Sequence, residues 1–445
     1  MSKVVLIGTN HAGIAFTNTV LGNSKDTELV IFERSPRVSY LGCGTALWVG
    51  QQIADNPDQL FYSSIPALEE KGAVVHTETA VTNVDFDAKT VTALGKDGKE
   101  ITETYDKLVF ATGSSPITPP IPGVDLENVH YLKLFTDGQI INALMDDPAI
   151  KKVAVVGAGY IGVEAAEAVR RRGRETMLFD VADTCLSGYY DPWFTEGIDK
   201  VLTENGIALH YGETVQAIKG NKKVESLVTD KGEYACDLVI LCIGFRPNNE
   251  LGQGRLELAP NGAFQVNLKQ ETSVPDVYAV GDCATVFSNA LQDRAYIALA
   301  TNAVRSGVVA ALNVIGVPLE SGGVQGSNGI SIYGYNMVST GLNLLGAKKA
   351  GFDPLYTDFE DLQKPAFVTC ENAPVKIRII YDRTTRRVLG AQLASTCDIS
   401  MGIHMFSLAI AKQVTIDELK LLDIFFLPHF NQPYNYITMA ALSAE

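Results

Sequence analysis

Short apolar runs, each followed by a glycine-rich turn, dominate the pattern of the first half of the chain. Residues 4–7 form an uninterrupted apolar run that leads into Gly8 and Gly13, and a second run at residues 29–32 ends at Glu33. An uninterrupted run of this length is typical of a strand buried on both faces of a parallel sheet. The stretch between the two runs has a helical pattern, so a strand, turn, helix and strand are expected in this order.

This order, closed by an acidic residue, is that of a Rossmann dinucleotide-binding unit. In such units the helix N-terminus holds a pyrophosphate and the acidic side chain takes a ribose hydroxyl. The first unit departs from the glycine pattern, because Asn10 stands at the second glycine position and His11 lies inside the turn. Taken alone, His11 is interpreted as a loop histidine; beside a reactive sulfur it becomes a candidate acid/base group.

A second unit, which starts at residues 153–156, matches the same pattern without a departure. Gly157, Gly159 and Gly162 form the turn, and the next apolar run ends at Asp180. Asp180 is therefore expected to bind an adenosine ribose diol, and the absence of Arg or Lys before Asp183 favours NADH over NADPH. The arginines that follow the intervening helix are interpreted as a solvated helix end stabilised by the helix dipole: Arg170, Arg171, Arg172 and Arg174.

The remaining patterns suggest how the domains are arranged. Residues 72–110 alternate in short strands, including 74–76, and predict a β-meander; prolines at 116–122 then mark a stiff linker. The strand and turn at 238–248 repeat those at 107–116, so the two units amount to an internal duplication. Another apolar strand ends at Asp282. Beyond residue 317 we expect long strands at 329–339, 375–381 and 388–393, a helix at 399–412, and an aromatic tail at 425–436 that packs against another subunit.

Cys43 is the candidate redox centre. Residues 45–53 could open as a helix, which would place this sulfur near a helix N-terminus and favour a thiolate. No second cysteine lies within ten residues, so the sulfur would store electrons as a sulfenate or a mixed disulfide rather than as a dithiol pair. A buried structural cysteine is the alternative. The other six cysteines are interpreted as small buried hydrophobic residues: Cys185, Cys236, Cys242, Cys283, Cys370 and Cys397.

Composition and charge exclude several classes of partner. The 445 residues carry a net charge of −15, so neither a nucleic acid nor an anionic membrane surface is an expected partner. No apolar run approaches membrane-spanning length and no signal sequence precedes residue 4, so a cytoplasmic protein is expected. The scattered cysteines have neither a disulfide framework nor zinc-ligand spacing, and no metal is predicted.

Together, the two glycine-rich units, the turn at 111–113, the strand end at Gly281-Asp282 and the lone Cys43 resemble the pyridine-nucleotide disulfide oxidoreductase superfamily. The resemblance runs the full length and is strongest to the branch of NADH peroxidases and water-forming NADH oxidases. It implies an α/β fold with two Rossmann-like domains and an α+β dimerisation domain. The implied limits are 1–116 and 245–316 for a discontinuous FAD domain, 117–244 for an inserted NAD domain and 317–445 for dimerisation.

The resemblance also implies the contacts of both cofactors. For FAD these are Gly8, Thr9, Asn10, His11, Ala12, Gly13, Glu33, Cys43, Ala111, Thr112, Gly113, Ser114, Lys133, Gly281, Asp282, Leu299, Ala300 and Thr301, together with Phe425 and His429 reaching toward the flavin of a partner subunit. For NADH they are Gly157, Gly159, Tyr160, Ile161, Gly162, Glu164, Asp180, Tyr189, Gly244 and Gly329.

The implied reaction is reduction of O2 to water by two NADH in a homodimer or a dimer of dimers. Four electrons are needed, while the flavin holds two, so Cys43 stores the second pair as a sulfenate and His11 stabilises the sulfur anion and exchanges protons. An NADH peroxidase would use the same two residues. A coenzyme A disulfide reductase ranks third, because no histidine is expected there at position 11. A non-catalytic electron-transfer flavoprotein would need a docking face, and this acidic chain offers no obvious basic patch.

Overall fold

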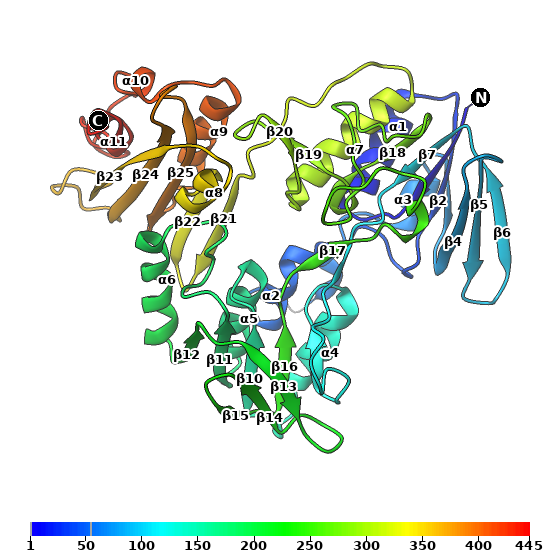
Figure 1. Ribbon diagram of the computed structural model, residues 1–445, viewed down its shortest axis with the longest axis horizontal. Helices are drawn as coiled ribbons and strands as arrows, with labels where there is room; N and C mark the ends of the chain where they lie inside the picture. The colour runs from blue at the N-terminus through cyan, green and yellow to red at the C-terminus, as the bar shows by residue number, and fades with distance from the viewer. Residues whose placement is uncertain (1, 54–55) are drawn as a thin grey trace.

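The computed structural model describes residues 2–53 and 56–445, which form three lobes (Figure 1). Each lobe is built around its own five-stranded sheet. The first lobe contains the N-terminus, the second lies below it in the view of Figure 1, and the third contains the C-terminus. The glycine-rich turns predicted from the sequence belong to the first two lobes.

The first sheet has the strand order β18-β7-β1-β2-β3, and all of its pairings are parallel. Its strands are β1 (Ser2–Ile7), β2 (Thr27–Phe32), β3 (Ala73–His76), β7 (Lys107–Phe110) and β18 (Val277–Ala279). Helices α1 (His11–Asn23) and α7 (Ala300–Val314) pack against each other beside it. Strand β18 comes from far along the chain, so this sheet is discontinuous in sequence.

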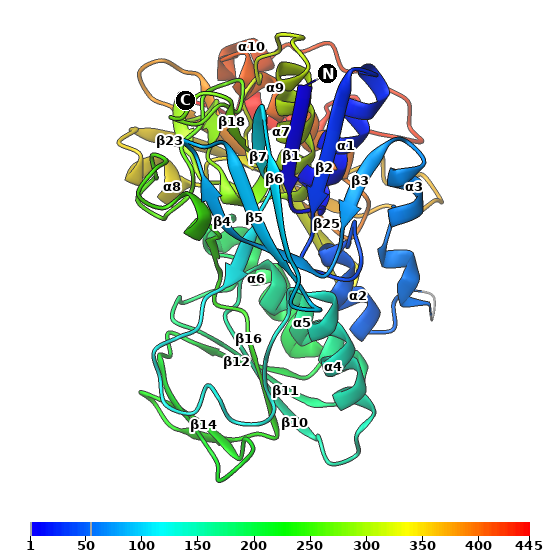
Figure 2. The ribbon, with the colours of Figure 1, turned by 90° about the vertical axis from the view of Figure 1, so that its right-hand side faces the viewer.

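A three-stranded antiparallel meander stands beside the first sheet (Figure 2). It consists of β4 (Thr79–Asp85), β5 (Thr90–Gly95) and β6 (Glu100–Thr104). The prediction that residues 74–76 belong to the meander is wrong, because they form β3, which pairs in parallel with β2 as the edge of the main sheet. These residues do not alternate between apolar and polar as the meander strands do.

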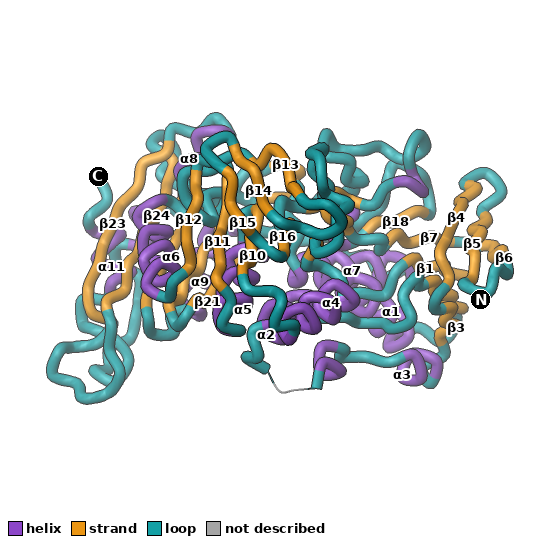
Figure 3. Tube along the Cα trace, turned by 90° about the horizontal axis from the view of Figure 1, so that it is seen from below, coloured by secondary structure: helices purple, strands orange, loops and turns teal. Residues whose placement is uncertain are grey.

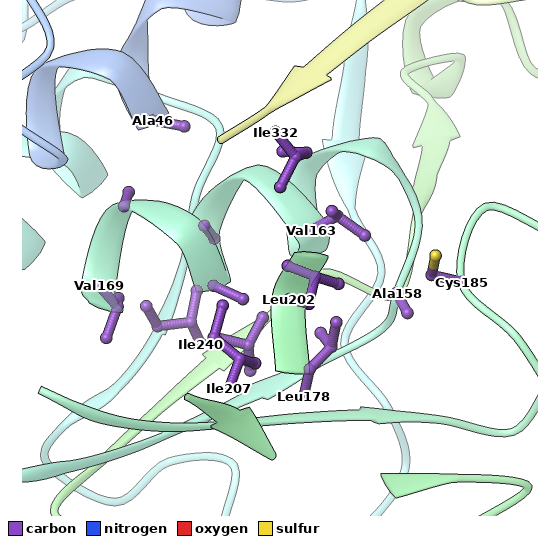
Figure 4. Packing of buried hydrophobic residues seen from close by; sticks show 14 of the residues in the cluster. Ala46, Ala158, Val163, Val169, Leu178, Cys185, Leu202, Ile207, Ile240 and Ile332 are labelled. Carbon is purple, nitrogen blue, oxygen red and sulfur yellow. The ribbon is translucent and has the colours of Figure 1, made fainter. Parts of the chain in front are cut away.

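The second sheet repeats the arrangement of the first, with the order β12-β11-β10-β16-β9 and parallel pairings. Its strands are β9 (Val129–Tyr131), β10 (Lys152–Val156), β11 (Glu175–Asp180), β12 (Ile207–Tyr211) and β16 (Leu238–Leu241), and its helices are α4 (Phe135–Asp146), α5 (Tyr160–Arg171) and α6 (Pro192–Glu204). The small sheet β13 (Val215–Lys219), β14 (Ser226–Thr229) and β15 (Glu233–Ala235) adjoins it. Figure 4 shows Val163 and Val169 of α5 packed over Leu178 and Ile240 of the sheet.

The chain passes between the first two lobes through a two-stranded antiparallel ribbon. Its strands are β8 (Ser114–Pro116) and β17 (Phe245–Pro247), with Phe245 opposite Pro116. The expected boundaries at 116/117 and 244/245 both fall at this ribbon; as exact limits they stay a prediction. Because the ribbon pairs the two crossings, the second lobe is an insertion that enters and leaves the first at one place.

The third sheet is antiparallel, in the order β21-β22-β25-β24-β23. Its strands are β21 (Asn328–Ile332), β22 (Tyr335–Gly341), β23 (Pro354–Leu362), β24 (Pro374–Asp382) and β25 (Val388–Ser395), and its helices are α8 (Leu344–Lys349), α9 (Ile403–Ala411), α10 (Ile416–Leu419) and α11 (Tyr436–Leu442). The hairpin β19 (Val286–Ser288) and β20 (Asp293–Ala295) leads toward it. Figure 3 shows this sheet and the β4–β6 meander at opposite ends of the molecule.

Two predictions for this lobe are corrected by the structure. The single strand expected at 329–339 is a hairpin, because Tyr333 and Gly334 both have positive φ and turn the chain between β21 and β22. The helix expected at 399–412 begins at Ile403, after a 3₁₀ turn at Ser400–Gly402. Within residues 2–53 and 56–445, no helix is long and apolar enough to cross a membrane.

Candidate active site

The first glycine turn holds its backbone against the end of β7. Gly8 has φ +102°, and a Cβ placed there would lie 2.4 Å from the Ala111 carbonyl oxygen; a Cβ on Gly13 would lie 2.1 Å from the Gly8 oxygen. The Glu33 carboxylate accepts hydrogen bonds from the Thr9 backbone N–H at 2.9 Å and from its hydroxyl at 2.8 Å. The turn therefore packs too tightly for side chains at two positions, and the acid at the end of β2 fixes its course.

The second glycine turn has the same contacts, position by position. A Cβ on Gly157, which has φ +100°, would lie 2.4 Å from the Cys242 oxygen, and one on Gly162 would lie 1.7 Å from the Gly157 oxygen. The Asp180 carboxylate accepts a hydrogen bond from the Ala158 N–H at 2.5 Å. The duplication inferred from the sequence thus extends to individual hydrogen bonds. Gly159, in contrast, faces open space, with no atom within 4 Å of a Cβ placed there.

A cavity of about 940 Å³ opens beside the first turn. This volume is within the range of about 300–1,000 Å³ that small-molecule and cofactor sites occupy. Its lining includes most residues expected to bind FAD: Gly8, Thr9, Asn10, His11, Ala12, Glu33, Ala111, Thr112, Gly113, Ser114, Lys133, Gly281 and Asp282. Leu299 lines a small adjoining hollow with Asp282, and Ala300 and Thr301 form the first turn of α7.

A chain of polar side chains crosses the cavity wall. The Lys133 ammonium donates to the Ser114 hydroxyl at 2.7 Å, and that hydroxyl donates to the Asp282 carboxylate at 3.0 Å. The ammonium also lies 3.9 Å from the ring centroid of Phe245. Burial lowers the pKa of Lys133, while the Asp282 carboxylate opposes this shift. The cleft therefore presents a positive and a negative group linked by one hydroxyl.

Cys43 lies in the 3₁₀ turn Gly42–Gly44, directly before α2 (Thr45–Val49). The segment leading to it is held in place by two hydrogen bonds: the Ser39 N–H donates to the Thr9 oxygen at 2.9 Å, and the Leu41 N–H donates to the Leu60 oxygen at 2.7 Å. The first glycine turn and the cysteine turn are thus connected through the backbone.

Cys43 lies next to the N-terminus of α2 as expected, and a backbone hydrogen bond lowers the pKa of its thiol, but the net shift of this pKa is upward rather than downward. Burial raises the pKa of the thiol and the carboxylates of Glu164 and Asp282 raise it further, while the backbone hydrogen bond and, more weakly, the Lys133 ammonium oppose them. Helix α2 has only five residues and starts two residues beyond Cys43, so its dipole is small there. Cys43 is nevertheless exposed as a residue.

His11 is the first residue of α1 rather than a loop residue. Its Nδ1 lies 2.9 Å from the Tyr62 hydroxyl, and the two rings stack with centroids 5.6 Å apart. Burial lowers the pKa of His11, and the Asp282 carboxylate opposes the shift. Tyr62 was not singled out in the sequence, because a tyrosine in a loop carries no motif. The expectation that His11 lies beside the sulfur stays a prediction.

Three segments that were expected to contact NADH meet at the start of α5. The Tyr160 hydroxyl is hydrogen-bonded to the Asn328 carboxamide oxygen and, at 2.9 Å, to the Tyr190 hydroxyl, and its ring meets the Tyr189 ring edge-on. Gly329 follows Asn328 in β21. Asn328 was missed in the sequence, since nothing in a strand of the third lobe pointed to the second.

Ile161, Glu164 and Gly244 complete the residues expected to contact NADH. Ile161 and Glu164 lie in the first turns of α5, and burial raises the pKa of Glu164 to about 7, with the Glu167 charge adding to this shift. Gly244 follows β16 with φ +104° and occupies the same place after its strand as Gly113 does after β7.

The aromatic tail is exposed in this chain. Phe425, Phe430 and Tyr434 are exposed by 66%, 56% and 76%, and neither Phe425 nor His429 lines the cavity described above. Exposed aromatic residues of this number agree with a packing surface for a second subunit. The contact of Phe425 and His429 with a partner's flavin stays a prediction.

Two expectations about polar and sulfur groups are wrong. Arg172 is not a solvated helix end: its side chain is only 6% exposed, and it donates to the Val49 oxygen at 3.0 Å and to Asn142 at 2.7 Å. Cys370, in the connection between β23 and β24, is exposed, and Cys242 is half-buried. The remaining cysteines of that group are buried: Cys185, Cys236, Cys283 and Cys397. Within residues 2–53 and 56–445, no group of three His, Cys, Asp or Glu side chains could hold a metal ion.

Two duplicated dinucleotide turns and a cysteine turn beside a large cleft define a two-nucleotide oxidoreductase. Residues 2–307 match the family model described as pyridine nucleotide-disulphide oxidoreductase, and residues 330–435 match the dimerisation domain of the same family. The chain belongs to the pyridine nucleotide-disulphide oxidoreductase family. The expected family, α/β fold, oxidoreductase class and pair of cofactors, FAD and NADH, are thereby confirmed.

Relatives of known function are similar over the whole chain. An NADH oxidase from Streptococcus pyogenes is 57% identical and one from Lactococcus lactis is 55% identical, each with 100% of both chains covered. The water-forming NADH oxidase from Lactobacillus brevis, solved bound to NADH, has a TM-score of 0.96 and 38% identity, covering 99% of this chain and 98% of that one.

Proposed function

We propose that this protein is an FAD-dependent NADH oxidase that reduces O2 to water and stores one electron pair on Cys43. The two relatives with 55–57% identity over the full chain are named NADH oxidases, and the Lactobacillus brevis enzyme, at 38% identity, is described as a water-forming NADH oxidase. We further propose that it acts in the cytoplasm as a homodimer or a dimer of dimers, for which the family dimerisation domain and the exposed aromatic tail are the support.

One observation carries the proposal: the turn of Cys43 lies where the two nucleotide-binding lobes meet, because α2, which follows it directly, packs against α4 and α5 of the second lobe. The pKa of Cys43 responds to Lys133 and Asp282, which line the first cleft, and to Glu164, which belongs to α5 of the second lobe. A sulfur at this junction is well placed to exchange electrons with a group that is itself reduced from the second lobe. No other cysteine stands near it in the sequence.

The residues of the first cleft suit a flavin dinucleotide. Gly8 and Gly13 leave no room for side chains where a pyrophosphate would approach the start of α1, and Glu33 stands at the position of a ribose acceptor. Lys133 and Asp282 offer charged partners for the polar parts of the ligand. Bound FAD would supply two-electron transfer from NADH to oxygen.

The electron count assigns a role to Cys43. One NADH and one proton reduce O2 to the level of hydrogen peroxide. The Cys43 thiolate then attacks one peroxide oxygen, the O–O bond breaks, and the products are a sulfenate and water. A second NADH and a second proton reduce the sulfenate to thiolate and release the second water. His11 would exchange these protons, since an imidazole titrates near neutral pH.

We propose NADH rather than NADPH as the reductant. The Asp180 carboxylate accepts hydrogen bonds from the backbone N–H groups of Ala158 and Ala182, which fix its position at the end of β11. An anion there accepts the ribose hydroxyls of NADH and repels the 2′-phosphate of NADPH.

The ratio of NADH consumed to O2 consumed tests the proposed function. A ratio of two, unchanged by catalase, is the expected result. A ratio of one that catalase raises toward two would show that peroxide is the product. Consumption of NADH only after hydrogen peroxide is added would identify an NADH peroxidase instead, and consumption of neither oxidant would leave only an electron-transfer flavoprotein.

Replacing the sulfur tests the electron store directly. Cys43→Ser is expected to keep reduction of the flavin by NADH but to release hydrogen peroxide, because no thiolate remains to give the peroxide the second electron pair and break its O–O bond. The measurement is peroxide formed per NADH oxidised. Cys370→Ser is the matched control, since this thiol is also exposed but lies in the third lobe, in the connection between β23 and β24. If Cys43→Ser still forms only water, the proposed role of Cys43 is wrong.

A further inference from the structure

We propose that Tyr62 is a positioning residue for His11: its hydroxyl and its ring together hold the imidazole in one orientation and one tautomer while His11 exchanges protons. This inference rests on the proposed function for the role of His11 as the proton-exchanging group. Tyr62 carries no sequence motif and belongs to the loop between the 3₁₀ turn Pro57–Leu60 and the helix α3 (Ile65–Glu69).

Two contacts fix the imidazole ring. The hydroxyl of Tyr62 lies 2.9 Å from Nδ1 of His11, and the rings are nearly parallel, with 5° between their planes and centroids 5.6 Å apart. The hydrogen bond sets the rotation of the ring within its plane, and the stacking sets the plane itself. Nε2, on the far side of the ring, is left without this partner, and His11 lines the cleft.

The loop that carries Tyr62 is hydrogen-bonded to the segment that carries Cys43. The Ser63 N–H donates to the Ser39 hydroxyl at 2.7 Å, that hydroxyl donates to the Ser63 oxygen at 3.0 Å, and Phe61 forms a β-bridge with Tyr40. The Ser39 N–H in turn donates to the oxygen of Thr9, two residues before His11. The tyrosine, the histidine and the cysteine turn are therefore held by one backbone network.

A hydroxyl suits a group that gains and loses a proton. It donates its hydrogen to Nδ1 when the imidazole is neutral, and it accepts the Nδ1 hydrogen when the imidazole is charged. A carboxylate or a carbonyl oxygen can only accept. Burial raises the pKa of Tyr62 to about 12, so the hydroxyl keeps its hydrogen throughout the working range. With Nδ1 accepting from the hydroxyl, the neutral ring carries its own proton on Nε2.

Burial and the nearby charged groups shift the pKa of His11. Asp282 raises the pKa of His11 and burial lowers it, with a net lowering. Glu33, which follows β2, is engaged with Thr9, and Arg305 of α7, the helix packed on α1, donates to the Asn302 carboxamide. Loss of the Tyr62 hydroxyl would remove an acceptor for the charged ring, and this bond is stronger than the one to the neutral ring. The pKa of His11 is therefore expected to fall.

Tyr62→Phe tests the hydroxyl while keeping the stacked ring, and Tyr62→Ala removes both. Tyr131→Phe is the control, because its hydroxyl bonds to Thr118 at 2.7 Å outside the cleft. Each FAD-loaded enzyme would be labelled with ¹⁵N at its six histidines, and the His11 signals assigned from a His11→Gln spectrum. The titration reports the tautomer and the pKa of His11, and oxidase rates over the same pH range supply the second readout.

We expect one tautomer, with the proton on Nε2, in the parent enzyme and in Tyr131→Phe. Tyr62→Phe should show mixed tautomers, a pKa of His11 lower by about 0.5–1 unit and an equal shift of the pH–rate profile. Tyr62→Ala should slow turnover further than Tyr62→Phe. An unchanged tautomer and pKa in Tyr62→Phe would overturn the inference. The spectrum decides this even if the parent enzyme releases peroxide, an outcome that contradicts the proposed function alone.

Discussion

The reactivity of Cys43 depends on its neighbours rather than on a helix dipole. Burial and two carboxylates raise the pKa of the thiol, and a backbone hydrogen bond and one ammonium oppose them. Because the thiolate is the reactive form, the chain by itself holds this sulfur in a less reactive state at neutral pH. Burial raises the pKa of Glu164 to about 7, so this side chain changes its charge near neutral pH. Among the charged neighbours, Glu164 is therefore expected to change the pKa of Cys43 most.

Glu164→Gln is expected to lower the pKa of Cys43 by about 0.5–1 unit, because a negative charge near the sulfur is removed. The measurement is the rate at which iodoacetamide alkylates Cys43 as a function of pH, without NADH. The midpoint of this curve should move to lower pH. Lys133→Met is the opposing control: its loss of a positive charge should move the midpoint to higher pH. Equal midpoints in all three proteins would contradict the electrostatic explanation.

At the scale of single residues, the sequence pointed to Cys43 and His11 as candidates but did not predict the pKa of Cys43 or the contact of His11 with Tyr62. Cys43 was singled out as a lone cysteine ahead of a possible helix, and His11 by its place in the glycine turn. His11 lines the cleft, whereas Cys43 follows Ser39 and Tyr40, which line it. The raised pKa of Cys43 depends on Glu164, a residue more than a hundred positions away, and Tyr62 contacts His11 only through the folded loop. Neither contact leaves a trace in local spacing.

The two glycine turns show how one short motif fixes an element. In each, the first and last glycines face backbone oxygens, while the middle position is free of close atoms in the second turn. The first and last positions therefore serve packing of the helix on the sheet, and the middle position serves the approach of a ligand.

This difference predicts that alanine at Gly162 lowers stability, whereas alanine at Gly159, in the same turn, weakens ligand binding. Gly162→Ala should destabilise the fold by at least about 2 kcal/mol, because its Cβ would lie 1.7 Å from the Gly157 oxygen. Gly159→Ala should leave the melting temperature unchanged and weaken the binding of NADH about tenfold, because its Cβ enters space that the ligand needs. Thermal unfolding without NADH and an NADH titration measure both. Similar melting temperatures for the two variants would show that the turn adjusts to a side chain.

Elements with a continuous apolar run were predictable, and those decided by tertiary contact were not. The strands β1, β2, β10 and β11 lie where the apolar runs were found. In contrast, Arg172 looked like a solvated helix end, yet it is buried against Val49 of α2. A run of arginines has the same sequence pattern whether its side chains are solvated or buried. Here the packing of α2 and α4 on α5 decides that Arg172 is buried.

At the scale of the whole molecule, a buried ion pair joins the second and third lobes. Asp191, at the start of α6, pairs with Arg378 of β24 at 3.2 Å, and their side chains are 4% and 8% exposed. The Gln392 carboxamide donates to the same carboxylate at 2.8 Å, and Arg378 also pairs with Asp358. The loop that contains Tyr189 and Tyr190 is thereby fixed to the third sheet.

Arg378→Met is expected to destabilise the protein by about 3–5 kcal/mol, because it leaves the Asp191 carboxylate buried without its cation. The exposed pair of Arg383 and Asp353 provides the control: Arg383→Met should cost no more than about 1 kcal/mol. Thermal or urea unfolding compares the two variants. A similar loss of stability in both would mean that the interface tolerates an unpaired Asp191.

The paired strands β8 and β17 bring the two ends of the inserted second lobe together. Since the entry and the exit of the inserted lobe face each other as Phe245 and Pro116, the chain could be rejoined across that short gap with a few residues. Removing the lobe in this way would delete the second glycine turn and leave all five strands of the first sheet in place. A protein cut and closed there should still bind a yellow cofactor, although without the contact of Lys133, and should no longer take up the reductant.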